Sequence, residues 1–346
     1  MAIYPGNAST VIPLFELSGN LMVAYGRNKS DINPNKYSRV TPVKSKVGNY
    51  LRFEPKDLVR LTGLEASTNW SPGTPRPTGF DNTLGYTVQP FRVQRKAFGT
   101  TLDKESVDIA SFPVMKTHTA ALGQKAMTHV AYRVSAALSN TANFDATHVF
   151  TASTASGTGF LSGGTTADPR IKNAFDYAAR LVQKDTFGAV KFGQLSVLMN
   201  HVTAQRLGSS REIREYVMQH EKAIDAIRLE KGSVYNALYG LPDRLYGYNV
   251  VVEDTFYNAA NRANSAETGS TVFPDNTIVM FLADGDLEQP EGASSFSTCH
   301  RFAYEEFTME TKDDTWNRLI ELSVVLNYDV QIVAPPTGCI LTNVFS

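Results

Sequence analysis

The clearest periodic pattern in the chain is an apolar residue at every fourth position between residues 111 and 140. It is formed by Leu122, Ala126, Val130, Val134 and Leu138. This spacing places the five side chains on one drifting face of a helix. Ser111 as N-cap and Pro113 in the first turn predict its beginning, and Asn140 and Asn143 predict its end. At 1.5 Å per residue such a helix is about 45 Å long, which predicts a structural rod.

Beyond residue 150, helical patterns alternate with short apolar strands, which is typical of a mixed α and β body. Helices are expected at 168–184 and 203–219, the second interrupted at Gly208-Ser209-Ser210, with a helix-like continuation over 221–230. Strands are expected at 195–199, 248–252, 277–282 and 302–310, followed by a strand pair over 319–333 that breaks near Asn327. Residues 151–168 and 258–274 are expected to be polar loops.

The first hundred residues show neither the clear periodicity of a helix nor that of a strand. Residues 1–45 are expected to form an irregular arm, and 46–100 a long two-stranded flap with strands at about 50–61 and 86–98 around a loop rich in Gly and Pro. Such a ribbon is only marginally stable alone. The segment also carries apolar residues that a disordered tail would lack, namely Leu14, Phe15, Leu17, Tyr25, Trp70 and Phe80. We therefore expect the arm and flap to be buried on another chain.

The composition excludes several classes of protein. The chain has 346 residues, of which 42% are hydrophobic and 19% charged, and a formal net charge of −1. This content is ordinary for a globular protein, and a protein that grips nucleic acid usually shows a basic excess. No run of 18 apolar residues and no secretory signal pattern is present. Cys299 and Cys339 form neither a disulfide framework nor a four-ligand zinc site, so both are expected to be reduced thiols.

Charge is distributed unevenly along the chain. Residues 1–60 hold nine basic and four acidic residues, for a net charge of +5, whereas residues 281–346 hold three basic and eleven acidic residues, for a net charge of −8. One interpretation is that the basic and the acidic segment each form a solvent-exposed face. The alternative is complementarity between copies, with a basic arm lying across an acidic surface of a neighbour.

Motifs that would carry chemistry are weak or incomplete. The glycine-rich stretch 157–164 lacks the Lys-Ser/Thr of a phosphate-binding loop, and His220-Glu221 lacks the second histidine of a zincin helix, because position 224 is isoleucine. No nucleophile elbow occurs. The acidic run 305–314 offers paired carboxylates, as any acidic hairpin does. No catalytic, cofactor-binding or metal-ligating residue is predicted, and no cofactor, so the chain is not expected to be an enzyme.

One self-modifying reaction stays open as a hypothesis. Some viral shell proteins join a flap lysine to an asparagine of a neighbour, and Lys56 and Lys96 lie in the expected flap. Simple solvation of both lysines is the plainer interpretation.

Three passages, together with the order of the expected elements, carry a resemblance to a known family. They are Val197-Leu198-Met199-Asn200 with Thr203 and Arg206-Leu207; residues 238–242 with 245–252; and residues 276–285. The chain resembles the major capsid proteins of tailed bacteriophages, which have the Hong Kong 97-like fold. The arm and flap match that family in position only.

The resemblance implies an α+β fold with the domains of such a capsid protein. These are an N-terminal arm (1–45), an extended β-ribbon loop (46–100), a peripheral domain with the spine helix (101–145), an axial domain (146–290), peripheral return strands (291–333) and a C-terminal segment (334–346). Family members often begin with a helical scaffolding segment of about a hundred residues that is not seen here. Scaffolding by a separate protein or processing would explain this, and the retained Met1 favours the former.

The resemblance also implies a function. The chain would self-assemble as pentamers and hexamers into an icosahedral shell in the host cytoplasm, and would be found in the virion. Its partners would be a scaffolding protein, a portal, a decoration protein and packaged double-stranded DNA held without specific recognition, with no membrane involved. The candidate contact residues between copies are Phe15, Tyr25, Arg27, Lys29, Arg39, Trp70 and Phe80.

Other functions remain open from the sequence. A nanocompartment shell of the same fold differs in its cargo, which is a packaged enzyme instead of DNA. A soluble α/β enzyme with a site in residues 150–290 belongs to a different class, and a phage tail or connector component is a further alternative.

Overall fold

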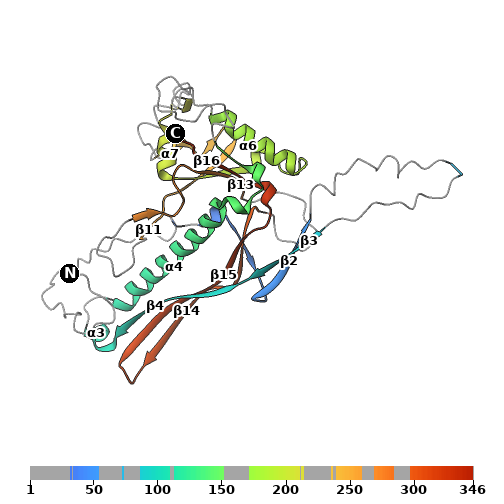
Figure 1. Ribbon diagram of the computed structural model, residues 1–346. Helices are drawn as coiled ribbons and strands as arrows, with labels where there is room; N and C mark the ends of the chain where they lie inside the picture. The colour runs from blue at the N-terminus through green and yellow to red at the C-terminus, as the bar shows by residue number, and fades with distance from the viewer. Residues whose placement is uncertain are drawn as a thin grey trace.

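The computed structural model describes residues 32, 34–53, 72–73, 86–109, 113–151, 171–210, 212–213, 235–236, 239–258, 269–283 and 297–345. Within them, two main sheets and a long helix form the body, and a two-stranded ribbon extends from one side (Figure 1). Residues 1–31 of the expected arm and most of the expected flap lie outside these residues.

The first sheet has four strands in the order β1-β14-β15-β4. They span Arg39–Pro42 (β1), Cys299–Asp314 (β14), Leu319–Ile332 (β15) and Gln94–Asp103 (β4). β14 is antiparallel to β15 along its length, with a bulge between Ala303 and Phe307, and β1 runs parallel to the first residues of β14. The short helix α3 (Lys104–Ile109) follows β4 at the far end of this sheet (Figure 1).

The helix α4 (Val114–Ser139) lies along the four-stranded sheet, as Figure 1 shows. The predicted apolar face is confirmed: Leu122, Ala126, Val130, Val134 and Leu138 are all buried. Asn140 is the C-cap, as expected, and its side chain caps the next turn by accepting a hydrogen bond from the Ala142 N–H at 3.1 Å. Pro113 takes the N-cap position without a side-chain cap, and Ser111 lies outside the described residues.

The second sheet has six strands in the order β5-β16-β13-β6-β10-β9. They span Val149–Thr151 (β5), Cys339–Thr342 (β16), Ile278–Leu282 (β13), Leu195–Asn200 (β6), Tyr248–Glu253 (β10) and Arg244–Leu245 (β9). Helices α6 (Ile171–Asp185) and α7 (His201–Gly208) lie beside this sheet (Figure 1). Every residue of β6 and β13 is buried, as expected for strands covered on both faces.

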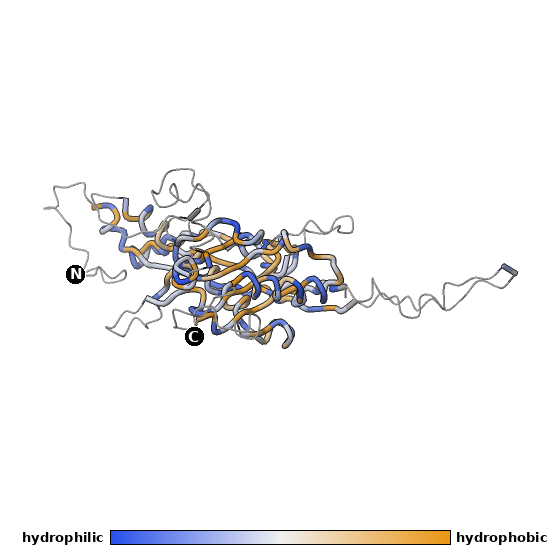
Figure 2. Tube along the Cα trace, turned by 90° about the horizontal axis from the view of Figure 1, so that it is seen from above, coloured by the Kyte–Doolittle hydropathy of each residue, from blue (hydrophilic) through white to orange (hydrophobic). Residues whose placement is uncertain are grey.

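Side chains alternate between two cores across the six-stranded sheet. Val197, Met199 and Met280 pack with α6 and α7, whereas Leu198 and Phe281 pack with α4 and β15. Figure 2 shows the apolar positions gathered along the middle of the body. This alternation unites both sheets and the long helix into one structure.

The remaining elements are short. β7 (Tyr235–Asn236) pairs with β8 (Leu241–Pro242), and β11 (Phe256–Asn258) pairs with β12 (Gly269–Thr271). Single 3₁₀ turns cover Pro34–Lys36, Thr141–Asn143, Ala146–His148, Phe192–Gln194 and Pro335–Thr337. The β11–β12 pair corrects the expectation that all of 258–274 is loop.

Three further expectations are corrected by the sheets. The single strand over 86–98 is two, because Val93 separates β3 (Tyr86–Arg92), which pairs with β2 (Val47–Phe53), from β4, which pairs with β15. The strand pair over 319–333 is one continuous strand, with Asn327 buried inside it. The expectation of an irregular arm is wrong for residues 39–42, because they form β1 and pair with β14 of the same chain.

Of the helix expected over 203–219, the structure shows α7, which ends at Gly208. A Cβ at Gly208 would lie 2.2 Å from the carbonyl oxygen of Tyr239, so only glycine fits this close backbone approach. The predicted interruption at Gly208 is therefore confirmed, and residues 214–219 lie outside the described residues.

Candidate subunit interface

The root of the ribbon is fastened to its own subunit through one face. In the β2–β3 register Tyr50 and Phe91 lie on the same face of the ribbon, and both rings stack on Phe302 of β14, with centroids 5.4 and 4.6 Å away. A Cβ at Gly48 would lie 2.6 Å from the Phe91 ring, so the bare backbone makes room for that ring. The aromatic contacts hold the base of the ribbon against the sheet.

The opposite face of the ribbon, which we call the outer ribbon face, is apolar and exposed. It is formed by Val47, Leu51 and Val88, whose exposed fractions are 63%, 58% and 51%. Leu51 and Val88 are direct cross-strand partners, so their side chains form one continuous patch. Contiguous exposed apolar side chains make this face a candidate interaction site. Because each side chain is already about half buried, covering its exposed part contributes roughly 1–2 kcal/mol to a complex.

The ribbon is also strongly basic. Residues 43–53 and 86–92, which form the ribbon and the segment leading into it, contain no Asp or Glu and four basic residues: Lys44, Lys46, Arg52 and Arg92. The ammonium of Lys46 lies 5.4 Å from the centroid of the Tyr304 ring. A surface that fits the outer ribbon face should therefore combine apolar and acidic side chains.

The outer half of the β14–β15 hairpin offers such a combination. Residues 305–321 contain six acidic and two basic residues. Phe307 and Met309 on β14 are 45% and 47% exposed. Because β1 pairs only with His300–Ala303, the far edge of β14 beyond Ala303 has no strand partner among the described residues, and such an edge presents backbone donors and acceptors for pairing.

Part of this acidic charge is paired within the chain. Arg95 contacts Glu310 at 3.1 Å, Lys104 contacts Asp313 at 3.0 Å, and Lys312 contacts Glu321 at 3.8 Å. All three pairs are well exposed, so each contributes roughly 0–1 kcal/mol to stability. The acidic hairpin therefore already pairs with basic residues of its own chain, namely one on β4, one on α3 and one on β14.

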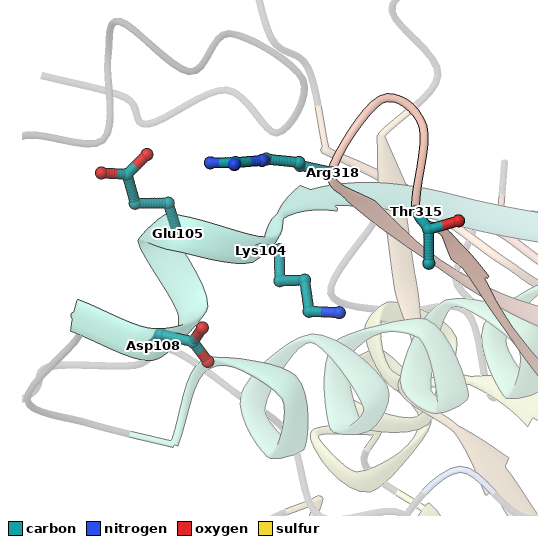
Figure 3. Close-up of a pocket in the computed structure, with 5 residues that line it drawn as sticks. All are labelled: Lys104, Glu105, Asp108, Thr315 and Arg318. Atoms are coloured by element: carbon teal, nitrogen blue, oxygen red, sulfur yellow. The ribbon is translucent and has the colours of Figure 1, made fainter.

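The tip of the hairpin presents a tryptophan to solvent. Trp316 is 91% exposed, in a turn closed by Asp314, whose carboxylate accepts hydrogen bonds from the backbone N–H groups of Trp316 and Asn317 at 3.1 and 3.2 Å. The Asn317 side chain donates a further bond of 2.8 Å, which is the main cause of the lowered pKa of Asp314. Beside this turn lies a pocket of about 480 Å³ lined by Lys104, Glu105, Asp108, Thr315 and Arg318 (Figure 3).

The root of the expected arm is anchored in the body. Tyr37, which is 1% exposed, lies beside Glu253 and Ser135, and burial, followed by the charge of Glu253, raises its pKa well above the usual value. Arg301, which is 2% exposed, donates a 2.6 Å hydrogen bond to the side chain of Asn35. These contacts fix residues 34–42 within their own subunit.

A buried Cys-His-Asp cluster lies between α6 and β16. Nε2 of His148 is 2.6 Å from the Asp185 carboxylate, and Nδ1 is 2.7 Å from the carbonyl oxygen of Gly338 and 3.4 Å from Sγ of Cys339. The order of groups resembles a nucleophile, base and orienting acid. However, Cys339 is 0% exposed, and burial, followed by the charge of Asp185, raises the pKa of its thiol. A buried neutral thiol is inert, so this cluster joins three segments of the fold.

Neither the second thiol nor the His, Cys, Asp and Glu side chains of the described residues form a reactive or metal-binding site. Cys299 is free and fully buried, and burial raises its pKa to about 12. In the part of the chain that the structure describes, no group of three or more His, Cys, Asp or Glu side chains is placed to hold a metal ion. The helices of that same part include none long and apolar enough to cross a membrane.

Comparisons with known proteins identify the fold. The mature capsid of bacteriophage PhiM1 matches with a TM-score of 0.56 at 13% identity, over 94% of this chain and 90% of that chain. A phage-related protein from Bordetella bronchiseptica matches with a TM-score of 0.54 at 14% identity, over 92% and 94%. The capsid of cyanophage P-SCSP1u matches with a TM-score of 0.53 at 10% identity, over 94% and 91%. The chain has the Hong Kong 97-like capsid fold.

These matches cover 92–94% of the chain. The α+β class expected from the sequence is confirmed. No family model and no curated protein matches the sequence. At identities of 10–14% the fold is retained while the sequence has diverged.

Of the seven predicted contact residues, six lie outside the described residues: Phe15, Tyr25, Arg27, Lys29, Trp70 and Phe80. Arg39 lies in β1, half-buried, and pairs in register with His300 of the same chain. Sequence reasoning missed the outer ribbon face and Trp316. A signal for Trp316 existed, since Asp313-Asp314-Thr315-Trp316-Asn317 is a turn-like stretch between two alternating segments.

The candidate motifs have mixed outcomes. The glycine-rich stretch 157–164, His220-Glu221 and Lys56 lie outside the described residues. Lys96 packs over Tyr328 of its own subunit, and burial, followed by the charge of Arg133, lowers its pKa. A link from Lys96 to an asparagine of a neighbour stays a hypothesis.

Proposed function

We propose that this chain is the major capsid protein of a tailed double-stranded DNA bacteriophage and assembles into the icosahedral head shell. The observation that carries the proposal is the ribbon, which is fastened to its own subunit by Tyr50 and Phe91 and exposes Val47, Leu51 and Val88 on the other face. A monomeric protein gains nothing from such a patch. The Hong Kong 97-like fold supports the proposal, because matched structures of this fold are capsids of phages.

We propose that the outer ribbon face of one copy packs on the acidic hairpin of the next. The ribbon contributes apolar side chains with a basic rim, and the hairpin contributes Phe307 and Met309 with an acidic rim. Copies linked head to tail in this way close into rings when the rotation between neighbours is a simple fraction of a turn, which fits the pentamers and hexamers of a shell. The role of the subunit is then structural, without catalysis or a cofactor.

The proposed domains follow the sheets. The four-stranded sheet with α4 is proposed as the peripheral domain and the six-stranded sheet with α6 and α7 as the axial domain. We include Cys339–Thr342 (β16) of the C-terminal segment in the proposed axial domain, because this strand pairs with β5 and β13. We propose a scaffolding protein, a portal and a decoration protein as partners in the assembled virion.

Electron microscopy of the purified full-length chain tests the proposal. We expect rings of five and six copies or closed shells, whose formation weakens with salt because the contacting surfaces carry opposite charge. A monodisperse monomer at every concentration tested would contradict it. Nuclease-protected DNA in native particles supports a phage head, whereas a packaged enzyme would assign the shell to a nanocompartment.

A further inference from the structure

The tip of the β14–β15 hairpin combines a protruding side chain with a pocket. Trp316 protrudes from the turn with 91% of its surface exposed. The Asp314 carboxylate fixes the turn, because it accepts hydrogen bonds from the backbone N–H groups of Trp316 and Asn317 at 3.1 and 3.2 Å and from the Asn317 side chain at 2.8 Å. With this exposure the indole makes little contact with its own chain.

The pocket is built from the same turn and from α3. The backbone N–H of Lys104 donates a hydrogen bond to the carbonyl oxygen of Arg318 at 2.9 Å. The side-chain ammonium of Lys104 contacts the Asp313 carboxylate at 3.0 Å. These contacts fix the hairpin turn against the first residue of α3. Figure 3 shows the Arg318 guanidinium directed across the pocket toward Glu105.

The lining has the chemistry that an indole requires. A guanidinium or ammonium is attracted to the face of an indole ring, and tryptophan is the best aromatic partner for such a cation. A buried indole N–H needs an acceptor, and Glu105 and Asp108 both supply carboxylate oxygens in this pocket. The pocket of about 480 Å³ also has room for a tryptophan side chain.

The protruding residue and the pocket lie on one turn, because Thr315 and Arg318, which line the pocket, flank Trp316. A copy that gives its tryptophan to one neighbour can therefore accept a tryptophan from another. Contacts of this head-to-tail type close into a ring around a symmetry axis.

We propose that Trp316 of one copy inserts into the pocket formed by Lys104, Glu105, Asp108, Thr315 and Arg318 of a second copy. This inference rests on the proposed function, because it requires copies to assemble. It concerns the tip of the hairpin whose strands are proposed to receive the outer ribbon face of a neighbour, and within one copy this tip and the ribbon lie at opposite ends of the four-stranded sheet (Figure 1).

Disulfide trapping between two distinguishable chains tests the contact. A Trp316→Cys chain labelled with ¹⁵N is co-assembled with an unlabelled Asp108→Cys chain and oxidised mildly, and the linked peptides are identified by mass spectrometry. The native Cys299 and Cys339 are fully buried and do not compete. We expect a disulfide that joins a labelled and an unlabelled chain. A Phe192→Cys chain, which replaces an exposed aromatic residue elsewhere, should give no such link to Asp108→Cys.

The outcomes separate this inference from the proposed function. Shells that form without the mixed disulfide overturn the inference alone. A wild-type chain that forms no assembly overturns both.

Assembly measurements on full-length variants give a second test. Trp316→Ala should raise the concentration needed for assembly by about tenfold or more, as expected for a central aromatic contact, and Trp316→Phe by less because the ring is kept. Phe192→Ala should have no effect. The double variant Trp316→Ala/Arg318→Gln should assemble no worse than Trp316→Ala, because the two residues act in one contact. Independent, additive effects would contradict the proposal.

Discussion

The six-stranded sheet and the β2–β3 ribbon place their apolar residues in opposite environments. All five residues of β13 are buried, because α6 and α7 cover one face of the sheet and α4 and β15 the other. On the ribbon, Val47, Leu51 and Val88 are more than half exposed, although the opposite ribbon face is packed on Phe302. The comparison distinguishes residues that fold the subunit from residues that are available to join subunits.

This difference predicts two kinds of mutational effect. A change in the sheet should lower the free energy of unfolding of the subunit, whereas a change on the outer ribbon face should leave it unchanged and impair assembly. The predictions below test this separation, beginning with the largest effect on the subunit.

The largest loss is expected for Leu198→Ala. Leu198 is 0% exposed and packs in the core shared with α4. Its truncation leaves a cavity, which should lower the free energy of unfolding by about 2–5 kcal/mol. Denaturant unfolding of the dilute subunit measures this. A loss below about 1 kcal/mol would show that this core is not tightly packed.

A smaller loss is expected for Gly208→Ala. The new Cβ would lie 2.2 Å from the Tyr239 carbonyl oxygen, so backbone must move, at a cost of about 1–3 kcal/mol. Gly193→Ala is the matched control, because nothing lies within 4 Å of a Cβ there, and it should change stability by less than about 0.5 kcal/mol. Thermal unfolding of both variants checks the difference, and equal effects would be inconsistent with the close approach.

A pH-dependent loss is expected from His129 on α4. Burial, followed by the charges of Lys96 and Arg133, lowers its pKa from 6.5 to about 4. A neutral ring can accept a hydrogen bond at Nδ1 from the hydroxyl of Tyr328, 2.8 Å away. The unfolded chain binds the proton more readily than the folded one. The contribution of the neutral His129 ring to the free energy of unfolding is therefore complete above pH 6.5 and is lost as the pH falls toward 4.

The His129→Gln variant isolates this contribution. Its amide oxygen can still accept the Tyr328 hydrogen bond but does not titrate. The free energy of unfolding of the wild type should fall more steeply between pH 6.5 and 4 than that of the variant. Parallel curves for the two proteins would refute the assignment.

The smallest effect on the subunit is expected for Leu51→Ser/Val88→Ser. These exposed residues should change the free energy of unfolding by less than about 0.5 kcal/mol, while the concentration needed for assembly rises by about tenfold or more. Gln89→Ser is the matched control, because Gln89 is exposed and lies on the other ribbon face. Light scattering of the assembly reaction measures the difference. Normal assembly of the double variant would argue against the proposed contact.

The sequence predicted the elements whose signal is local. The four-residue spacing from Leu122 to Leu138 defined α4 and its buried face, and the apolar runs defined β6, β10 and β13. The signal for β16 was too weak, since this strand has four residues and is stabilised by β5 and β13, which lie far away in sequence.

Pairing choices between distant segments were not predictable. The apolar pattern over 86–98 alternates imperfectly and shows no clear end of a strand, and only the partners β2 and β15 decide that the stretch forms two strands. β1 was not predictable for the same reason, because it forms only by pairing with the first residues of β14. The outer ribbon face also required the register, because the sequence alone does not tell which face of the ribbon lies on Phe302.

The most direct test of the account is the reactivity of a thiol on the outer ribbon face. A Val88→Cys chain is labelled with a maleimide as free subunits and again after assembly, with the buried Cys299 and Cys339 as unreactive internal references. If copies cover this face in the shell, labelling should slow by about tenfold or more on assembly, as at the dry centre of an interface. Closed particles in which this thiol reacts as fast as in free subunits would contradict the account.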